Sequence, residues 1–418
     1  MKNNYIAILI FLTFLAISLT SCTREVQLVL EADISSLERN IPSFEQSQAF
    51  EEVGLAISNF SQNLFRKVLE AGEENAVFSP LSAYYALTMV ALGAREGTLH
   101  EFQAVLGENP QYLAPKLASI AQSLIYIGGN TELTVAGSVW VCDRFTVKPE
   151  FNQNMIHYFY AYAQARNLSN QSTIDEINYW IYGQTRGLLY NVIKEIDEDI
   201  MMMLINTLYL SAEWARAFNP MGESISTFYL ECGDKTETIF LSTNHFNSHA
   251  MSITNYYEAV ILPYDDGRLS FFLVRPTDGT SIRNFAASHD LMNIVSSLNI
   301  HHEILVRMPK LDKEFDIEMS NQLKAMGLTL AFDEHLANLQ GLVEGYDPIY
   351  IYEVRQVARI MVNTEGTEAV AVTIVSPAEA SSLHQPIELT FNTPYIYIMF
   401  DNKTSAILFM GVVDNPSA

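Results

Sequence analysis

Cysteine is scarce in this chain: Cys22, Cys142 and Cys232 are the only three among 418 residues. Their spacing does not suggest a metal site or a disulfide framework. A chain of this length needs no such framework, because it can bury a large apolar core. We therefore expect Cys142 and Cys232 to be free thiols that are mostly buried in their apolar surroundings.

Basic residues are also few, with 24 Lys and Arg against 48 Asp and Glu, which gives a formal net charge of −24. Such a chain is repelled by the phosphate backbone of a nucleic acid and by an anionic membrane surface. We therefore expect no nucleic-acid partner. The charge favours solubility and cationic partners, but it does not identify a function.

Signatures of catalysis are missing as well. The sequence has no His-Glu-x-x-His helix, no Gly-x-Ser-x-Gly elbow and no glycine-rich phosphate loop. His301, His302 and Glu303 are adjacent, but neighbouring side chains of a strand point to opposite faces. We expect no catalytic residue, no metal and no cofactor, and hence a protein that is not an enzyme.

An apolar run opens the chain. Lys2 precedes the run at residues 6–19, which is the pattern of an export signal and is too short for a membrane span. The run ends in Leu-Thr-Ser-Cys at Cys22, which resembles the lipobox of a bacterial lipoprotein. Cleavage before Cys22 and acylation of its thiol and new amino group would anchor the protein to a membrane. The alternative is a plain secretory signal with a chance cysteine.

These features predict three parts. Residues 1–21 are the lipoprotein signal peptide, residues 22–45 are the lipidated Cys22 and a polar tether, and residues 46–418 are one folded domain. No repeat and no Pro/Gly/Ser-rich linker divides the third part. We expect a monomer in the bacterial cell envelope, on the outer membrane or the cell surface. Its orientation toward the periplasm or the exterior stays open.

Apolar periodicity predicts an α+β fold in which helices come first and strands dominate later. The predicted helices span residues 49–69, 82–92 and 172–185. The predicted strands span residues 201–210, 257–262, 269–275, 303–308, 387–391, 395–400 and 406–413.

Small and β-branched residues follow Gly366 in an alternating pattern. In a strand, one face would carry small side chains and the other would carry valines and a single charge. The small face is formed by Thr367, Ala369, Ala371 and Thr373, and the opposite face by Glu368, Val370 and Val372. Residues 374–386 are small, polar and bounded by proline, which is typical of an exposed loop. The residues alone also fit an ordinary core strand followed by a surface loop.

Several separated motifs resemble those of the serpin family, in the same order, and together they span residues 44–416. They are residues 75–82 (NAVFSPLS), 92–98 (LGAREGT), 206–214 (NTLYLSAEW), 262–264 (LPY), 308–311 (MPKL), 391–395 (FNTPY) and 409–411 (FMG). The resemblance implies a large central β-sheet with additional sheets, about eight to nine helices and an exposed reactive-centre loop at about residues 366–386.

The resemblance also implies a suicide-type inhibitor. A protease would cut the loop and form an acyl-enzyme, and the freed hinge would insert into the central sheet and trap the protease. Gly366 would supply backbone freedom where the hinge turns into the sheet. The hinge residues are Glu365, Gly366, Thr367, Glu368, Ala369, Val370, Ala371, Val372 and Thr373. The alternative is a non-inhibitory envelope lipoprotein with the serpin fold that binds or scaffolds other proteins.

The resemblance implies a position for the cut bond in two ways. In the family, the residue at the position of Thr364 is the seventeenth before the cut, which gives Ala380–Ser381. Counting back from the FNTPY motif gives the alternative, Leu383–His384. We adopt the first. Small residues there suit elastase-like or subtilisin-like serine proteases, with cysteine proteases as a further candidate. The absence of Arg and Lys between residues 364 and 394 argues against trypsin-like targets.

The resemblance further implies a cluster that controls sheet opening, formed by Ser79, Ser82, Asn206, Trp214 and Gln356. The family often has His where Gln356 aligns. A Gln side chain also donates and accepts hydrogen bonds, but it does not titrate.

The start of the hinge departs from the family pattern at one position. The family usually has a Glu where Thr364 stands. The usual ion pair of that Glu is therefore in doubt, and Glu365 is the candidate replacement.

Overall fold

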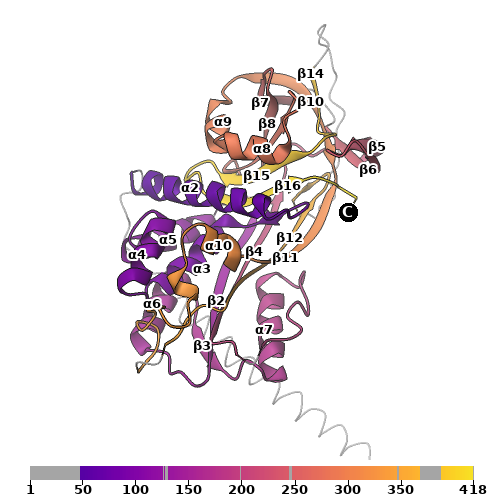
Figure 1. The fold of residues 1–418 in the computed structure, drawn as a ribbon. Helices are drawn as coiled ribbons and strands as arrows, with labels where there is room; N and C mark the ends of the chain where they lie inside the picture. The colour runs from indigo at the N-terminus through magenta and orange to yellow at the C-terminus, as the bar shows by residue number, and fades with distance from the viewer. Residues whose placement is uncertain are drawn as a thin grey trace, which may run out of the picture. The chain divides into compact units, whose positions relative to one another are not determined.

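The computed structural model describes residues 48–125, 127, 130–197, 199–243, 247–345, 348–367 and 387–417 (Figure 1). The chain divides into two compact units, Met1–Glu45 and Gln46–Ala418, and every described residue belongs to the second. Cys22 lies outside the described residues. Among the residues that the structure describes, no helix is both long enough and apolar enough to cross a bilayer.

Helices occur along the described part of the second unit, and six of the nine come before residue 200. They are α2 (Gln48–Glu70), α3 (Pro80–Ala91), α4 (Glu96–Leu106), α5 (Pro110–Ile125), α6 (Pro149–Phe159), α7 (Gln171–Gln184), α8 (Ile282–Ser288), α9 (Leu291–Ser297) and α10 (Ser320–Ala325). Helix α3 begins at a strong local signal: Ser79 caps it by accepting a hydrogen bond from the Ser82 amide, and Pro80 follows at the first helical position. Every residue of α3 is buried, so this helix lies at the centre of the fold.

The strands form two sheets. The six-stranded central sheet has the order β11 (Leu311–Glu318), β12 (Glu353–Val362), β13 (Gly366–Thr367), β4 (Met202–Glu213), β2 (Glu132–Cys142) and β3 (Ala163–Arg166). The ten-stranded sheet runs β1 (Val77–Phe78), β16 (Ile407–Val413), β15 (Tyr395–Asp401), β9 (Leu269–Pro276), β8 (Tyr257–Pro263), β7 (Asn247–Ile253), β10 (His301–Pro309), β6 (Lys235–Ser242) and β5 (Ser224–Tyr229). Strand β14 (Ile387–Thr390) pairs with β10.

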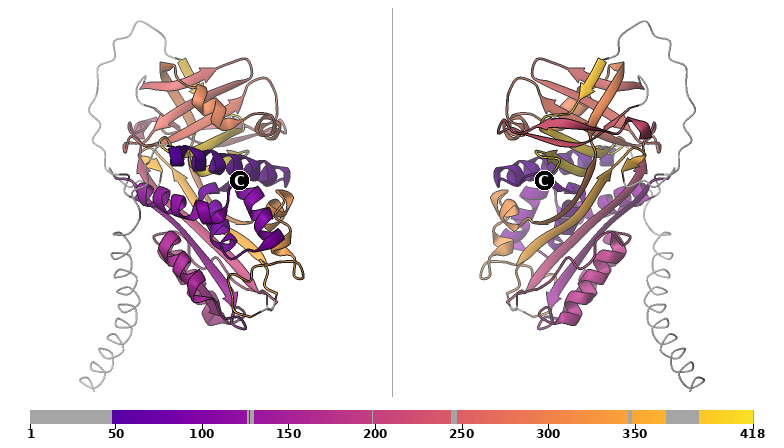
Figure 2. Two further views of the ribbon diagram at one scale, coloured as in Figure 1. Left: turned by 90° about the vertical axis from the view of Figure 1, so that its left-hand side faces the viewer. Right: turned by 90° about the vertical axis from the view of Figure 1, so that its right-hand side faces the viewer.

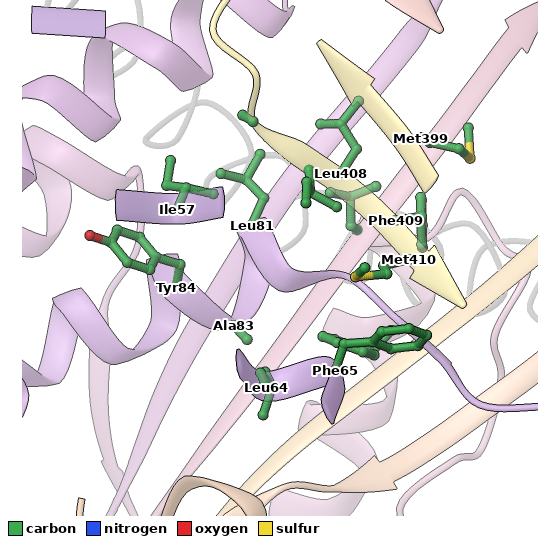
Figure 3. Packing of buried hydrophobic residues seen from close by; sticks show 14 of the residues in the cluster. Ile57, Leu64, Phe65, Leu81, Ala83, Tyr84, Met399, Leu408, Phe409 and Met410 are labelled. Atoms are coloured by element: carbon green, nitrogen blue, oxygen red, sulfur yellow. The ribbon is translucent and has the colours of Figure 1, made fainter. Parts of the chain in front are cut away.

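The two faces of the central sheet are covered by different helices (Figures 1 and 2). Along β4, Met203 and Ile205 belong to the apolar cluster that includes Ile177 of α7, whereas Met202 and Leu204 belong to the cluster that includes α2 and α3. The alternation follows from the two-residue period of a strand. Side chains of α2, α3, β15 and β16 meet in the interior in Figure 3.

Most predicted elements are confirmed to within a few residues. Two long strands of the central sheet, β2 and β12, were not predicted, although β2 places eleven strand residues in the helical first half. The thiols are free, as expected, but their predicted burial is wrong. Cys142 ends β2 and is partly exposed. Cys232 is exposed because it lies in the turn between β5 and β6, where its thiol is 3.5 Å from a carboxylate oxygen of Asp234.

The feature that positions the site is the seam between β4 and β12. Residues 353–357 of β12 pair directly and in parallel with residues 203–207 of β4. Toward the other end of the seam, β13 lies between them: Thr367 is paired with Ala212 of β4 and with Val362 of β12. The seam is therefore closed at one end and parted by two residues of the predicted hinge at the other.

Candidate functional site

Backbone hydrogen bonds hold the start of the hinge at the parted end of the seam. The amide of Trp214 donates to the carbonyl of Glu365 at 2.8 Å, and the amide of Phe218 donates to the carbonyl of Thr364 at 2.8 Å. The indole N–H of Trp214 donates to the carbonyl of Asn363 at 3.0 Å. Three consecutive carbonyls are thus bound by the segment that follows β4, independently of the hinge side chains.

Thr367 enters the sheet as the small-residue face predicts. Its side chain is 2% exposed, and its hydroxyl lies 2.6 Å from the hydroxyl of Tyr264. Tyr264 stacks on Trp214 with ring centroids 4.6 Å apart and an interplanar angle of 9°. Burial raises the pKa of Tyr264 far above its ordinary value, so its hydroxyl stays protonated and neutral. The pocket beside Tyr264 thus holds a small hydroxyl side chain through a neutral hydrogen bond.

Gly366 is required for a different reason from the one expected. Its φ lies outside the left-handed region, so the conformation itself does not demand glycine. A Cβ atom at this position would instead collide with the carbonyl oxygen of Ala212 and approach the Cα of Glu213 to 2.8 Å. The hinge can lie this close to β4 only because Gly366 has no side chain.

Asn363 shapes the turn that leads into β13. Its side-chain oxygen accepts hydrogen bonds from the amides of Glu365 at 2.9 Å and Gly366 at 3.0 Å. Its amide donates to the Gly366 carbonyl at 2.9 Å. Asn followed three residues later by Gly is a turn signal that could have identified this role from the sequence.

Among the described residues, the structure shows no ion pair of Glu365 that could replace the one in doubt. No ion pair of the described residues involves its carboxylate. Thr364, at the position of the usual Glu, is 5% exposed and contributes its carbonyl to the bond from Phe218. Hydrogen bonds to the backbone therefore hold this end of the hinge without a charged pair.

Gln356 ties the closed end of the seam to helix α3. Its side-chain oxygen accepts from the Ser79 amide at 2.6 Å, and its side-chain nitrogen donates to the Ser79 carbonyl at 2.9 Å and to the side-chain oxygen of Asn206. Gln356 on β12 and Asn206 on β4 are directly opposite each other, and both are fully buried. One neutral amide thus links two strands and the N-terminus of a helix.

Asn206 and Ser82 complete this network. The Ser82 hydroxyl lies 3.1 Å from both the side-chain oxygen of Asn206 and the carbonyl of Thr207, and the Asn206 amide donates to the carbonyl of Arg355 at 3.3 Å. Parting β4 from β12 here would break side-chain bonds as well as the backbone ladder. None of these groups titrates near neutral pH.

Four of the five residues predicted to control sheet opening are therefore together, namely Ser79, Ser82, Asn206 and Gln356. Trp214 is not with them. It lies eight residues beyond Asn206, roughly 26 Å away along the strand direction, at the parted end. The two ends of the seam therefore differ: an amide network holds one end, and an aromatic clamp formed by Trp214, Tyr264 and Phe218 lies at the other.

The remainder of the predicted site lies outside the described residues. This applies to Glu368, Ala369, Val370, Ala371, Val372 and Thr373 and to both bonds, Ala380–Ser381 and Leu383–His384. Among the residues that are described, no group of three His, Cys, Asp or Glu side chains could hold a metal ion.

Comparison with known proteins gives one family. Residues 55–416 match the sequence profile of the family described as "Serpin (serine protease inhibitor)". The chain is 26% identical to glia-derived nexin of Rattus norvegicus, covering 88% of this chain and 94% of the nexin. It is similar to the native state of tengpin, a thermophilic serpin, with a TM-score of 0.79, 26% identity, and coverage of 87% of this chain and 94% of that one. At 20% identity, the fold alone is shared with human thyroxine-binding globulin, with a TM-score of 0.80 and coverage of 88% and 99%. With its central sheet parted at one end by the hinge and a family match over most of its length, the chain belongs to the serpin family.

Proposed function

We propose that this serpin inhibits proteases by inserting its cleaved reactive-centre loop between β4 and β12. The observation that carries the proposal is the position of Gly366 and Thr367, which already pair with both strands. The residues that would follow them into the seam are small or β-branched, except for Glu368, and include no proline. Once the loop is cut, each further pair of hinge residues adds backbone hydrogen bonds to both neighbours.

Insertion of the loop requires contacts between β4 and β12 to break. The direct pairing between residues 353–357 and residues 203–207 must be broken, together with the Gln356–Asn206 bond. Helix α7 covers the other face of this seam, since Ile177 belongs to the same apolar cluster as Met203 and Val357. The inserting strand must therefore pass beneath α7 while its outward valines replace solvent contact with apolar contact.

We propose serine proteases with small apolar specificity pockets as targets, of the elastase-like or subtilisin-like kind. Ala380 and Ser381 at the cut bond, and the absence of Arg and Lys between residues 364 and 394, support this class. Leu383–His384 is the second bond to test, and cysteine proteases are the second target class. The inhibitor acts as a monomer, because its mechanism needs one chain and one protease.

A non-inhibitory function is the alternative, since serpin-fold proteins such as thyroxine-binding globulin are known in complex with a small ligand. The hinge argues against it here. Thr367 is a small residue in a site that would reject a large or charged one, and no bulky, charged or proline residue follows on its face up to Thr373.

We also propose that acylation of Cys22 holds the inhibitor at the bacterial cell envelope. Residues 23–45 would then act as a polar tether that lets the domain meet proteases near the membrane. Anchoring through lipid also accounts for membrane attachment by a chain whose net charge of −24 would oppose electrostatic binding to anionic lipids.

Inhibition is tested by mixing residues 23–418 with elastase-like, subtilisin-like, trypsin-like and papain-like proteases. We expect a denaturant-stable complex at the summed mass with a protease of the first two kinds, and a released carboxy-terminal peptide whose mass begins at Ser381. Inhibitor that has been cut in the loop but carries no bound protease should have a much higher melting temperature than the native protein, because the inserted strand completes the sheet. Cleavage without any complex across the panel, with unchanged melting, would favour the scaffold function.

Thr367→Arg should convert the inhibitor into a substrate. The guanidinium would replace a hydroxyl that is 2% exposed beside neutral Tyr264, and burying an unpaired charge costs several kcal/mol, on the order of 3 to 5. The stoichiometry of inhibition, measured by titration against the best protease, should rise at least tenfold. Thr367→Ser keeps the hydroxyl and serves as the matched control. Equal stoichiometry in both variants would contradict insertion at this position.

Gln356→Glu should weaken the closed end of the seam in a pH-dependent way. The carboxylate cannot donate to Ser79 and Asn206, so the native state should lose about 3 kcal/mol at pH 8. Burial raises the pKa of a Glu in the folded state, so the variant gains stability as pH falls toward 5 and the carboxyl takes up a proton. Urea unfolding at the two pH values measures this. Gln153→Glu, at an exposed site on α6, is the control, and a similar response from both variants would argue against the network.

Cys22→Ala should release the protein from membranes, because no acyl chain can then be attached. Fractionation of expressing cells should move the protein from the membrane pellet to the soluble fraction. Cys232→Ala removes a thiol from the folded domain and should leave the protein in the pellet. Persistent pelleting of the Cys22 variant would mean that another feature anchors the chain.

A further inference from the structure

A cavity of about 210 Å³ lies against Trp214 and Phe218 of the aromatic clamp. Its walls are apolar over much of their area and come from the segment after β4 and from β8. It is lined by Trp214, Ala215, Arg216, Phe218, Thr243, His249, Leu262 and Pro263. Ala215, Arg216 and Pro263 are exposed, so the cavity is open to solvent on their side.

His249 places a polar side chain in the wall of the cavity. The residue belongs to β7 and is only 7% exposed; its ring lies near the backbone of Ile261, yet neither ring nitrogen makes a hydrogen bond of normal geometry with a described residue. Buried polar side-chain atoms in native proteins are nearly always paired. An imidazole of this kind in a cavity wall offers a polar group that a bound ligand can use, in place of water.

The charges at the cavity select the kind of ligand. Burial and the positive charge of Arg216 lower the pKa of His249 to about 4, so its ring is neutral at pH 7 and carries one N–H donor. Arg216 lines the exposed side, and no carboxylate is among the lining residues. A negatively charged group that accepts from the His249 N–H would also be attracted by the Arg216 guanidinium.

The size and shape of the cavity select the rest of the ligand. A closed apolar cavity of about 150 Å³ is enough to hold benzene, so this one has room for a single ring with a short polar group. The rings of Trp214 and Phe218, 5.7 Å apart and tilted by 59°, offer an aromatic corner for such a ring. We propose that the cavity is a binding site for a small aromatic carboxylate, with the ring against Trp214 and Phe218 and the carboxylate at His249 on the Arg216 side.

Occupancy would act on the hinge through the same two residues. Trp214 and Phe218 line the cavity with their side chains and bind the carbonyls of Glu365 and Thr364 with their backbone amides. A ligand that packs on these rings stabilises the arrangement in which the hinge is held at the parted end, and so it should slow further insertion. This consequence rests on the proposed inhibitory function, whereas the binding site does not.

Binding is tested by isothermal titration of the full chain with phenylacetate and, as its neutral analogue, 2-phenylethanol. We expect one phenylacetate site with a dissociation constant below about 1 mM and at least tenfold weaker binding of the alcohol. His249→Leu should weaken phenylacetate about tenfold, the effect of losing one charge-assisted hydrogen bond. His335→Gln is the control, since the His335 side chain is 82% exposed and does not line the cavity; it should bind as the native chain does.

No saturable binding, or equal affinity in the native chain and His249→Leu, would overturn the site. Equal affinity for the acid and the alcohol would overturn the choice of an anionic ligand. Thermal melting checks that His249→Leu is folded; if it is not, exposed Arg216→Gln replaces it and should weaken phenylacetate about threefold or more. The effect of the ligand on hinge insertion is measured separately, as a fall in the rate of protease inhibition when phenylacetate is added. A chain that binds phenylacetate but inhibits no protease would refute the proposed function and leave the site standing.

Discussion

The pairing of β4 with β12 is the interaction on which the rest of the structure depends. Backbone groups at this seam can be satisfied in two ways, by each other or by a strand placed between them. The structure contains both arrangements at once, since residues 203–207 pair directly with β12 while Ala212 pairs with Thr367 of the hinge. A sheet that has already accepted two hinge residues needs no new topology to accept more. What it needs is separation of the closed end.

The two ends of the seam are controlled by different chemistry. At the closed end, Gln356, Asn206 and Ser79 form neutral hydrogen bonds that break only when the strands part. At the parted end, the amides of Trp214 and Phe218 donate to hinge carbonyls, and these bonds do not depend on the hinge side chains. Tyr264 contacts the side chain of residue 367 and limits its size. The Thr207 hydroxyl at the closed end is fully buried and has no partner among the described residues, an arrangement that typically costs about 1 to 3 kcal/mol. The hydrogen-bond network of the closed seam therefore leaves one buried hydroxyl without a partner among the described residues.

The sequence predicts the parts of this site whose signals are local. The cap at Ser79 and Pro80, the apolar strand that contains Asn206, and the small face that begins with Thr367 all come from neighbouring residues, and the structure has each of them. The Tyr264–Thr367 contact joins residues 103 positions apart and has no local signal. The same is true of the separation of Trp214 from the other four residues, because a motif that includes both Asn206 and Trp214 hides the length of the strand between them. The burial of Cys232 was mispredicted because apolar neighbours in sequence do not show that a turn exposes the residue.

The side chains that hold the closed end and the parted end of the seam are uncharged. Gln356 is an amide that does not titrate, Tyr264 is held protonated by burial, and no ion pair of the described residues involves Glu365 at the hinge. The amides and hydroxyls of Gln356, Asn206 and Ser82 do not change charge between about pH 5 and pH 8. His249 lines the cavity beside the clamp, and its lowered pKa keeps it neutral over the same range. Amides, hydroxyls and aromatic rings are the side chains that meet at the two ends of the seam. Parting β4 from β12 among the described residues would therefore break neutral hydrogen bonds, which depend little on ionic strength.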